Sequence, residues 1–320
     1  MKIAITDYSF PNLDVEAGIL HPLGHEIVAW NEKRSAELPQ LVADADAVIT
    51  QFAAVNAEVI ASMRQAKVIV RYGIGVDNVD LAAAKARGIP VCNVPDYCID
   101  EVADQTLSFI LATTRQVVAN CMKVRDGKWG LATPLDQMRV LRDLTVGIVG
   151  FGRIGREVVA RLRAFKCKIQ VHDPVVVDSE IEQAGCTPVS LRELISQSDV
   201  ISLHCPSLAQ TRGMINRDTL MNMKRGVILI NVARGDLIDS DALTVAIQNG
   251  QVSAAALDVF APEPIPADHP ILKMDNVIVA SHIASCSVPA VRKLRETVAN
   301  LAAMALRGDV LPSVVNGVVK

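Results

Sequence analysis

Arg234, Glu263 and His282 are the side chains whose types and positions best suit catalysis. Each stands at or just beyond the end of an apolar, β-branched run, and open α/β sheets bind their ligands at the carboxyl ends of strands. A neutral imidazole can take a proton from a hydroxyl group and the imidazolium can return it, with a carboxylate beside it to hold the tautomer. A guanidinium can grip a carboxylate through paired donors. A surface arginine or a structural histidine is common. The prediction therefore rests on the three residues following three successive apolar runs.

The motif G-F-G-R-I-G over residues 150–155 lies between a buried-strand pattern and a helical pattern. In that context G-x-G-x-x-G predicts a dinucleotide site. Gly150 permits the tight turn, Gly152 lets the backbone approach a pyrophosphate, and Gly155 lets the helix and strand pack closely. A turn that binds nothing is the alternative. The backbone amides expected to meet the phosphates, at the positive end of the helix, are those of Arg153 and Ile154.

Asp173 comes 18 residues after Gly155, at the end of the next apolar run. Its carboxylate can accept hydrogen bonds from ribose hydroxyls and would repel a 2′-phosphate. No arginine follows closely, because Pro174 and three valines come next. The sequence therefore favours NAD over NADP, unless Asp173 merely starts a turn before Pro174. His204 ends another apolar run and is predicted to line the same nucleotide crevice.

A second glycine turn, Gly73-Ile74-Gly75, follows Tyr72 near the end of an apolar run. It lacks the third spaced glycine, so it is a poor dinucleotide site, but its amides can face a small anion. A tight turn without a ligand is the alternative. The remaining histidines are weaker candidates for acid–base chemistry: His21, His25, His172 and His269.

Short β-branched runs alternate with helical patterns along the whole chain, and most runs lack polar alternation. That pattern is typical of strands buried on both faces of a parallel sheet, and its repetition predicts right-handed βαβ units in an α/β fold. Two series of runs, separated near Pro95, predict two doubly wound parallel-sheet domains, with a Rossmann NAD domain inserted in a flavodoxin-like substrate domain. The expected boundaries are 1–98 plus 289–320 for the substrate domain and 99–288 for the NAD domain. A single helix is expected over Ile99–Val118.

The composition narrows the class of protein. The chain has 320 residues, of which 50% are hydrophobic and 21% charged, as in a globular protein of two domains. A net charge of −3 and a pI near 6.1 give no electrostatic footprint for nucleic acid or an anionic membrane. No apolar run reaches the roughly 18 residues of a membrane span. The seven scattered cysteines, without C-x-x-C, predict reduced thiols in a cytoplasmic protein rather than disulfides or a metal site.

The chain resembles the D-isomer-specific 2-hydroxyacid dehydrogenases, a family that includes D-3-phosphoglycerate dehydrogenase, glycerate/hydroxypyruvate reductases and the C-terminal-binding-protein corepressors. The resemblance spans nearly the whole chain. It implies reversible hydride transfer between NAD(H) and a small 2-oxo acid or D-2-hydroxy acid of the phosphoglycerate, glycerate/hydroxypyruvate or glyoxylate type. It also implies a homodimer joined through the stretch near residues 100–140. The motifs that carry it are R-Y-G-I-G-V-D-N at 71–78, G-F-G-R-I-G at 150–155, N-V-A-R-G at 231–235, A-L-D-V-F with E-P at 256–264, and S-H-I-A at 281–284.

The resemblance implies a role for each matching position. Asp258 would contact the nicotinamide amide, Asp173 would bind the ribose, and the loop Tyr72–Gly75 would bind the substrate carboxylate. The substrate-binding residue, the acid–base residue and its carboxylate partner would be, in that order, Arg234, His282 and Glu263. Further positions expected to face the cofactor are Thr106, His204, Val232, Ala233, Ala284 and His282 itself.

Two loops depart from the family pattern. Ser285-Cys286-Ser287 follow His282 where many members carry glycine and threonine, and Gln51-Phe52-Ala53-Ala54 replace the commoner small hydroxyl residues of a substrate-side loop. The second departure leaves the identity of the substrate open. The alternatives are an NAD(H)-sensing, corepressor-like protein with weak turnover and a dehydrogenase of a non-carboxylate anion such as phosphite. Glu263 argues against the formate dehydrogenase branch, which carries an amide at the matching position.

Overall fold

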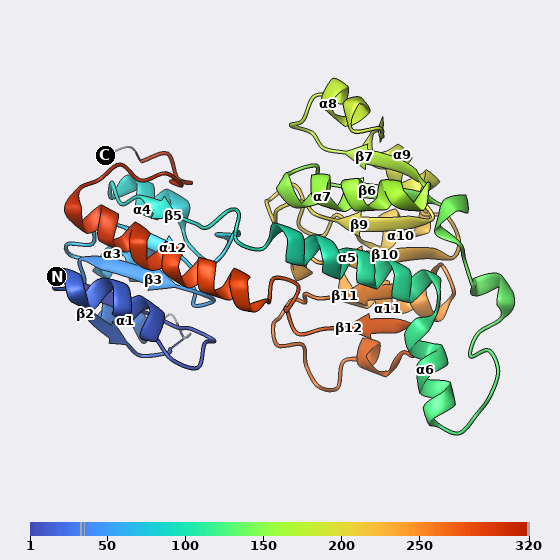
Figure 1. Ribbon diagram of the computed structural model, residues 1–320, viewed down its shortest axis with the longest axis horizontal. Coiled ribbons are helices and arrows are strands. Elements are labelled where there is room, and N and C mark those ends of the chain that lie inside the picture. The colour runs from blue at the N-terminus through green and yellow to red at the C-terminus, as the bar shows by residue number, and fades with distance from the viewer. Residues whose placement is uncertain (33, 35, 319–320) are drawn as a thin grey trace. The chain divides into compact units, whose positions relative to one another are not determined.

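Two parallel sheets organise the chain, as Figure 1 shows. The computed structural model describes residues 1–32, 34 and 36–318. One sheet has five strands in the order β2-β1-β3-β4-β5, and the other has seven in the order β12-β11-β10-β9-β6-β7-β8. Neighbouring strands in both sheets pair in parallel. The expected α/β fold with two parallel sheets is confirmed.

The first unit comprises Met1–Tyr97 and Ser287–Lys320 and holds the five-stranded sheet, whose strand order is that of flavodoxin-like folds. Helices cover both faces: α12 and α1 pack on the face of Ile3 and Ile5, while α2, α3 and α4 pack on the face of Ala4 and Val48. The strands are β1 (Lys2–Ile5), β2 (Glu26–Ala29), β3 (Ala47–Thr50), β4 (Ile69–Arg71) and β5 (Val91–Cys92). The helices are α1 (Asp14–Leu20), α2 (Leu38–Val42), α3 (Ala57–Ser62), α4 (Leu81–Ala86) and α12 (Val288–Arg307).

The second unit, Cys98–Cys286, holds the seven-stranded sheet. The strand order reverses direction between β6 and β9, and a doubly wound sheet places its ligand crevice at such a switch point. The strands are β6 (Thr145–Val149), β7 (Lys168–His172), β8 (Thr187–Pro188), β9 (Val200–Leu203), β10 (Val227–Asn231), β11 (Val252–Leu257) and β12 (Val277–Val279). The helices are α5 (Ile99–Thr114), α6 (Val117–Arg125), α7 (Arg153–Leu162), α8 (Asp178–Gln183), α9 (Leu191–Gln197), α10 (Arg217–Met221) and α11 (Ser240–Gln248).

The single helix expected over Ile99–Val118 is wrong. The chain leaves α5 at Thr114, and Gln116 takes a left-handed backbone with φ of 52° before α6 begins at Val117. A residue with that φ cannot continue a right-handed helix, so the apolar pattern runs through a break that periodicity does not mark. Short 3₁₀ turns complete the fold: His21–Leu23, Leu135–Gln137, Leu141–Asp143, Arg163–Phe165, Gly235–Leu237 and Pro270–Lys273.

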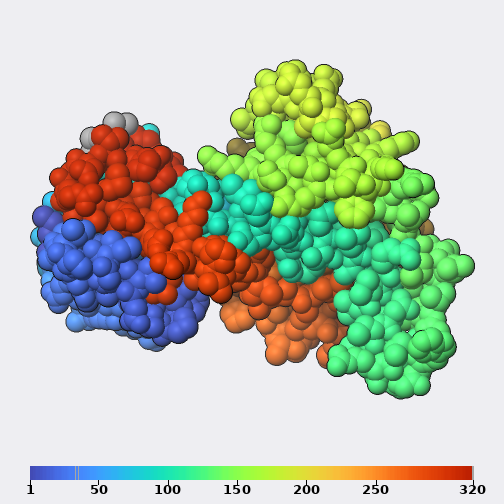
Figure 2. Space-filling model, viewed as in Figure 1, coloured from blue at the N-terminus to red at the C-terminus, as the bar shows by residue number. Residues whose placement is uncertain are grey.

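The segment from α6 to residue 140 carries many exposed apolar side chains. Figures 1 and 2 show it, in green, extending from the sheet of its own unit. Trp129 is 92% exposed and Leu135 is 73% exposed. Among the described residues, no helix combines the length and apolar character needed to span a bilayer. The exposed apolar side chains of this segment are Val117, Val118, Met122, Val124, Trp129, Leu131, Leu135 and Val140.

Candidate active site

His282 and Glu263 form a hydrogen-bonded pair beyond the ends of β12 and β11. The His282 Nδ1 atom lies 2.8 Å from the Glu263 Oε2 atom, and both side chains are about one third exposed. Because a carboxylate only accepts, Nδ1 carries the shared proton, and the other ring nitrogen, Nε2, is the atom that can exchange a proton with a ligand. This is the arrangement of an acid–base histidine with its orienting carboxylate.

The Glu263 carboxylate is held in its charged form. Burial acts to raise its pKa, but the hydrogen bond and charge of His282, the backbone amide of Phe260 and the charge of Arg234 outweigh burial and lower that pKa. The Phe260 amide donates to Glu263 Oε1 at 2.9 Å, so the two carboxylate oxygens have separate partners. The Phe260 amide therefore fixes one carboxylate oxygen while the other pairs with the imidazole.

Arg234 stands on the neighbouring loop, which follows β10. Its Nη1 atom donates to the carbonyl oxygen of Ala233 at 2.7 Å, and its own carbonyl oxygen accepts from Asn231 Nδ2 at 2.8 Å. Gly235 explains how closely this loop meets the Glu263 loop: a Cβ at that position would lie 1.9 Å from the carbonyl carbon of Phe260. Only glycine fits there, so the loops carrying Arg234 and Glu263 pack backbone against backbone.

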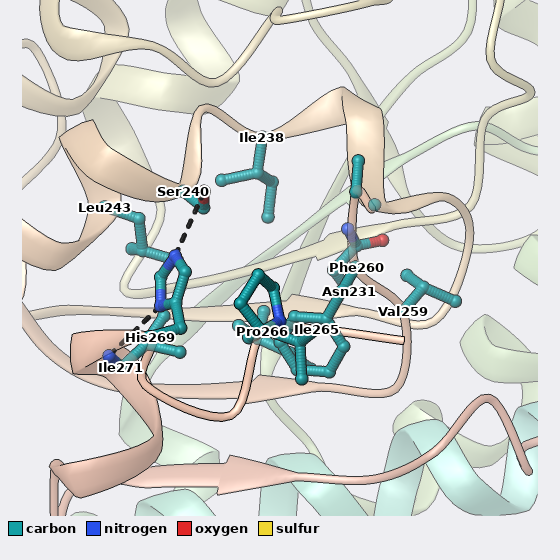
Figure 3. Close-up of a pocket in the computed structure, with 13 residues that line it drawn as sticks. Asn231, Ile238, Ser240, Leu243, Val259, Phe260, Ile265, Pro266, His269 and Ile271 are labelled. Atoms are coloured by element: carbon teal, nitrogen blue, oxygen red, sulfur yellow. Dashed lines mark hydrogen bonds between the residues drawn. The ribbon is translucent and has the colours of Figure 1, made fainter. Parts of the chain in front are cut away.

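A small crevice lies behind the Glu263 loop, and Figure 3 shows its lining. His269 belongs to this crevice, where its Nε2 atom lies 3.4 Å from Ser240 Oγ and its Nδ1 atom accepts from the Ile271 amide at 3.2 Å. Both ring nitrogens of His269 are thus used in packing the loop, which agrees with its weak standing as an acid–base candidate. The apolar side chains of the lining include Ile238, Leu243, Val259, Phe260, Ile265, Pro266 and Ile271.

Asp258 holds the loop that carries His282. It is 1% exposed, and its Oδ1 and Oδ2 atoms accept from the amides of Ile283 and Ala284, each at 2.9 Å. Its carbonyl oxygen accepts from the His282 amide at 2.7 Å. His282 has a left-handed backbone with φ of 56°, a conformation that costs a non-glycine residue free energy and persists where the surroundings fix it. Sequence reasoning gave Asp258 a cofactor contact and missed this positioning role.

The glycine motif at 150–155 has the geometry of a nucleotide cradle. Gly150 has φ of 99°, and a Cβ there would lie 2.7 Å from the carbonyl carbon of His204. A Cβ on Gly155 would lie 2.2 Å from the Gly150 carbonyl oxygen, so helix and strand meet at glycine contact distance. A Cβ on Gly152 would meet no atom within 4 Å, which leaves open space where a phosphate would approach. The helix α7 begins directly afterwards, and its first backbone amides lack partners within the helix.

Asp173 lies one residue beyond β7 and ties that strand to the glycine motif. Its Oδ2 atom accepts from the Phe151 amide at 2.7 Å, and its Oδ1 atom accepts from Val175 and Val176 at 2.9 and 3.1 Å. Burial acts to raise its pKa, but these three backbone hydrogen bonds outweigh it, so the pKa of Asp173 is lowered. The charged, half-exposed carboxylate suits ribose hydroxyls and opposes a 2′-phosphate.

Four further residues predicted to face the cofactor lie in the second unit, and they differ from one another in burial and hydrogen bonding. The His204 Nε2 atom lies 2.8 Å from Ser202 Oγ, and burial lowers the pKa of His204 to about 4, so the ring is neutral. Val232 is buried and Ala233 half-buried where the chain leaves β10. Thr106 is fully buried, and its hydroxyl donates to the Val102 carbonyl of its own helix at 2.7 Å. In this structure the Thr106 hydroxyl is therefore used in a hydrogen bond within α5.

The turn Tyr72–Gly75 belongs to the first unit and follows β4. The Tyr72 phenol is buried and donates to Glu16 Oε1 at 3.0 Å, and its pKa is raised well above 10 by burial and by the Glu16 charge. The side chain of Tyr72 therefore anchors the turn from within the core, and the half-exposed residues Ile74 and Gly75 remain for a ligand.

Arg71 is a residue of this turn to which the sequence reasoning gave no role. Gly73 has φ of 145°, and a Cβ there would lie only 1.5 Å from Arg71 Nη1, so the guanidinium occupies the side-chain position of Gly73. Arg71 is 8% exposed and lies 6.0 Å from the ring centre of Phe52. The sequence feature that could have indicated a role for Arg71 is its position two residues before Gly73.

The chain is similar to known proteins over most of its length. Residues 107–284 match the family model described as D-isomer specific 2-hydroxyacid dehydrogenase, NAD binding domain. D-3-phosphoglycerate dehydrogenase of Mycobacterium tuberculosis is 38% identical over 276 residues, which cover 86% of this chain and 52% of that protein. Glyoxylate reductase of Thermofilum pendens is 36% identical over 301 residues, which cover 91% of this chain and 87% of that protein.

A solved structure shares the whole architecture. D-lactate dehydrogenase from Aquifex aeolicus, crystallised with NAD and lactic acid, covers 96% of this chain and is itself covered to 96%, with a TM-score of 0.87 and 30% identity. The chain spans about half the length of the D-3-phosphoglycerate dehydrogenases that it matches and most of the length of the glyoxylate reductase.

Proposed function

We propose that this chain, which belongs to the D-isomer specific 2-hydroxyacid dehydrogenase family, transfers a hydride between NAD(H) and a small 2-oxo acid or D-2-hydroxy acid. The observation that carries the proposal is the His282–Glu263 pair at 2.8 Å, on loops beyond two neighbouring parallel strands of a dinucleotide-binding sheet. A carboxylate on one ring nitrogen and a partly exposed ring are what an acid–base histidine needs.

The protein's own residues would supply the proton and the orientation. When bound, NADH would supply the hydride that adds to C2 of the 2-oxo acid. His282 would give its Nε2 proton to the carbonyl oxygen, and Glu263 would stabilise the imidazolium before the proton transfer and hold the ring afterwards. Arg234 would polarise the carbonyl and bind the carboxylate through its paired donors. In the oxidation direction the same imidazole takes the hydroxyl proton.

NAD is assigned to the glycine motif of the second unit. The α7 amides of Arg153 and Ile154 would bind the pyrophosphate, Gly152 leaves the space for it, and Asp173 would accept from the ribose hydroxyls. The turn at Gly73–Gly75, with the Arg71 guanidinium packed into it, is assigned the carboxylate of the substrate.

Small polar 2-oxo acids are the proposed substrates, with glyoxylate and hydroxypyruvate first. The support is the similarity to the glyoxylate reductase of Thermofilum pendens, which is 36% identical over 91% of this chain. The panel that tests the proposal measures NADH oxidation with glyoxylate, hydroxypyruvate and 3-phosphohydroxypyruvate, and NAD reduction with phosphite.

The panel separates the proposed reaction from its rivals. Turnover of a 2-oxo acid that is lost in His282→Ala supports the proposal. A chain that binds NADH tightly and turns over none of the acids would be a sensor of the corepressor kind, and turnover of phosphite alone would make it a dehydrogenase of a non-carboxylate anion. The first result would overturn the proposed reaction, and the second would also overturn the assignment of Arg234 and Gly73–Gly75 to a carboxylate.

We propose further that the chain forms a homodimer through the α6 segment. The support is the run of exposed apolar side chains from Val117 to Val140, which is larger than scattered surface residues and marks an interaction surface. Trp129→Ser with Leu135→Ser should shift the mass measured by light scattering to that of a monomer. A wild-type chain of monomer mass at micromolar concentration would contradict the dimer.

A cytoplasmic location is proposed on the state of the cysteines. All seven are free in the structure, and burial raises the pKa of Cys92, Cys186 and Cys205 to about 11, which keeps them as unreactive thiols. Free thiols without any disulfide suit a reducing compartment. Fractionation of cells followed by detection of the chain would test this.

A further inference from the structure

Asp7 is a buried carboxylate in the first unit that binds three successive backbone amides of one loop. The loop follows β3, the strand next to β1, and Asp7 lies two residues beyond β1. The amides of Gln51, Phe52 and Ala53 donate to the Asp7 carboxylate at 3.0, 2.7 and 3.1 Å. Asp7 is fully buried, and a buried charge persists only where hydrogen bonds of this kind compensate it.

The loop that Asp7 holds is joined to the glycine turn. Asn78, at the far end of that turn, donates from Nδ2 to the Ala53 carbonyl at 2.8 Å, and its own carbonyl accepts from the Val55 amide at 2.8 Å. The Tyr72 amide donates to the Thr50 carbonyl at 2.8 Å. The loop and the turn are therefore cross-linked on both sides of the place where Phe52 approaches Arg71.

The same relation recurs in the second unit, where Asp258 lies directly beyond β11 and its carboxylate binds the amides of the loop after the neighbouring strand β12. That loop carries His282. In both units an aspartate at a strand end, itself buried, fixes the loop after the adjacent parallel strand. In both units the loop that a buried aspartate holds lies at the proposed site. We therefore connect this type of contact with loops whose position matters for chemistry.

We propose that Asp7 is a positioning residue for substrate recognition: its carboxylate fixes residues 51–53, and through them sets the shape of the Arg71–Gly75 anion-binding turn. The inference rests on the proposed function, because it takes that turn to bind the carboxylate of the substrate. Asp7 acts through backbone amides and touches no reacting atom. Its loss should change which 2-oxo acid is preferred and should leave NADH binding, a property of the second unit, as it was.

The experiment compares Asp7→Asn with a matched variant, Asp46→Asn. Asp46 also accepts from a backbone amide of the same sheet, that of Lys2 at 2.8 Å, but at the opposite end of β3. For both variants, kcat and KM are measured with glyoxylate and hydroxypyruvate, the NADH Kd by fluorescence titration, and Tm by calorimetry. Displacement of a positioning loop is expected to raise KM about tenfold or more in Asp7→Asn.

The ratio of kcat/KM between the two substrates is the decisive readout. Partial unfolding lowers both values equally, whereas a moved loop treats a hydrogen and a hydroxymethyl group at C2 differently, by about threefold or more. Asp46→Asn should lower Tm without changing the ratio. An unchanged ratio and KM in Asp7→Asn, whatever its Tm, overturns the proposal. If Asp7→Asn does not fold, Asp7→Glu keeps the charge, moves the loop and is judged by the same ratio.

A second measurement keeps this inference apart from the proposed reaction. With saturating NADH, oxamate, an unreactive analogue of a 2-oxo acid, should raise the Tm of the wild-type chain and of Asp46→Asn, and should raise that of Asp7→Asn much less at the same concentration. If no 2-oxo acid is turned over, the proposed function fails while this shift still judges Asp7. An equal shift in all three proteins, or none in the wild type, overturns the role of Asp7.

Discussion

The two glycine turns of this chain have similar sequences and different surroundings. At Gly150 the turn runs directly into α7, and a Cβ on Gly152 would meet open space. At Gly73 no helix follows until α4 begins at Leu81, and the position that a Cβ would take is filled by a guanidinium. The first turn offers helix amides to a pyrophosphate, and the second offers backbone amides beside a fixed positive charge to a small anion.

On the proposed assignments, the element after a glycine turn and the groups packed against the turn decide its ligand more than the spacing of the glycines does. The same assignments place the cofactor cradle and the acid–base pair in the second unit and an anion-binding turn in the first. If that division is real, substitutions in the two units should change different kinetic constants.

The largest effect is expected from His282→Ala. Loss of the only proposed proton donor should lower kcat for 2-oxo acid reduction by about 10²–10⁴-fold, because that is what a positioned acid–base residue contributes. NADH affinity, read by fluorescence titration, should stay within about twofold, since the glycine motif is untouched. His269→Ala, which removes an imidazole from the same unit, serves as the control and should keep most of its kcat. A His282→Ala enzyme with more than a tenth of the wild-type kcat would contradict the assigned role.

Gly73→Ala and Gly150→Ala test the division itself. Each places a Cβ on a glycine with positive φ, at 145° and 99°, and each Cβ would collide, with Arg71 in one case and with the His204 backbone in the other. Strain of about 1–3 kcal/mol at each turn corresponds to roughly a fivefold to 150-fold loss of binding. Gly73→Ala should raise the KM of the 2-oxo acid and leave the NADH Kd alone, and Gly150→Ala should raise the NADH Kd. If both variants changed the same constant, the two turns would not have separate ligands.

A smaller effect is expected from Asp173→Asn. The amide can still accept from Phe151, so the glycine motif keeps its shape, but the negative charge that opposes a 2′-phosphate is gone. The wild type should prefer NADH to NADPH in kcat/KM, and the variant should narrow the gap by about tenfold. Asp173→Ala, which also loses the hydrogen bond to Phe151, should weaken binding of both cofactors. Equal kcat/KM values for the two cofactors in the wild type would refute the preference.

The fold was predictable because its strands are buried on both faces. The runs expected at 145–150 and 227–232 appear as β6 (Thr145–Val149) and β10 (Val227–Asn231), each one residue shorter. The break between α5 and α6 was not predictable, because the left-handed residue there is a glutamine and no glycine or proline marks it. Local patterns of apolar residues predict burial well, but they do not predict the dihedral angles of a single residue such as Gln116.

Some contacts of the candidate site were predictable, namely those in which one residue type has one structural requirement. Gly150, Gly155 and the pairing of Glu263 with His282 follow from the steric and protonic needs of a nucleotide site and an acid–base pair. The positioning roles of Asp7 and Asp258 were beyond reach, since their carboxylates bind backbone amides of loops that lie next to them only after the parallel strands pair. Sequence spacing carries no record of a contact made across 44 residues of chain, as between Asp7 and Gln51.

The smallest effect is expected from Glu263→Gln. Glutamine keeps an acceptor for His282 Nδ1 and removes the negative charge, so kcat/KM for reduction at neutral pH should fall only about threefold to tenfold.

The pH dependence of the Glu263→Gln variant tests the role of the carboxylate charge more directly. Reduction needs the imidazolium, so its rate falls as pH rises, and without the carboxylate charge this alkaline fall should begin at lower pH. The pKa of Glu263 is lowered from 4.5, so the wild-type carboxylate is charged throughout an assay at neutral and alkaline pH and adds no fall of its own. Rate profiles for both proteins with glyoxylate, measured at saturating NADH, would check this, and an alkaline fall that stays in place would mean that Glu263 orients the ring without stabilising its charge.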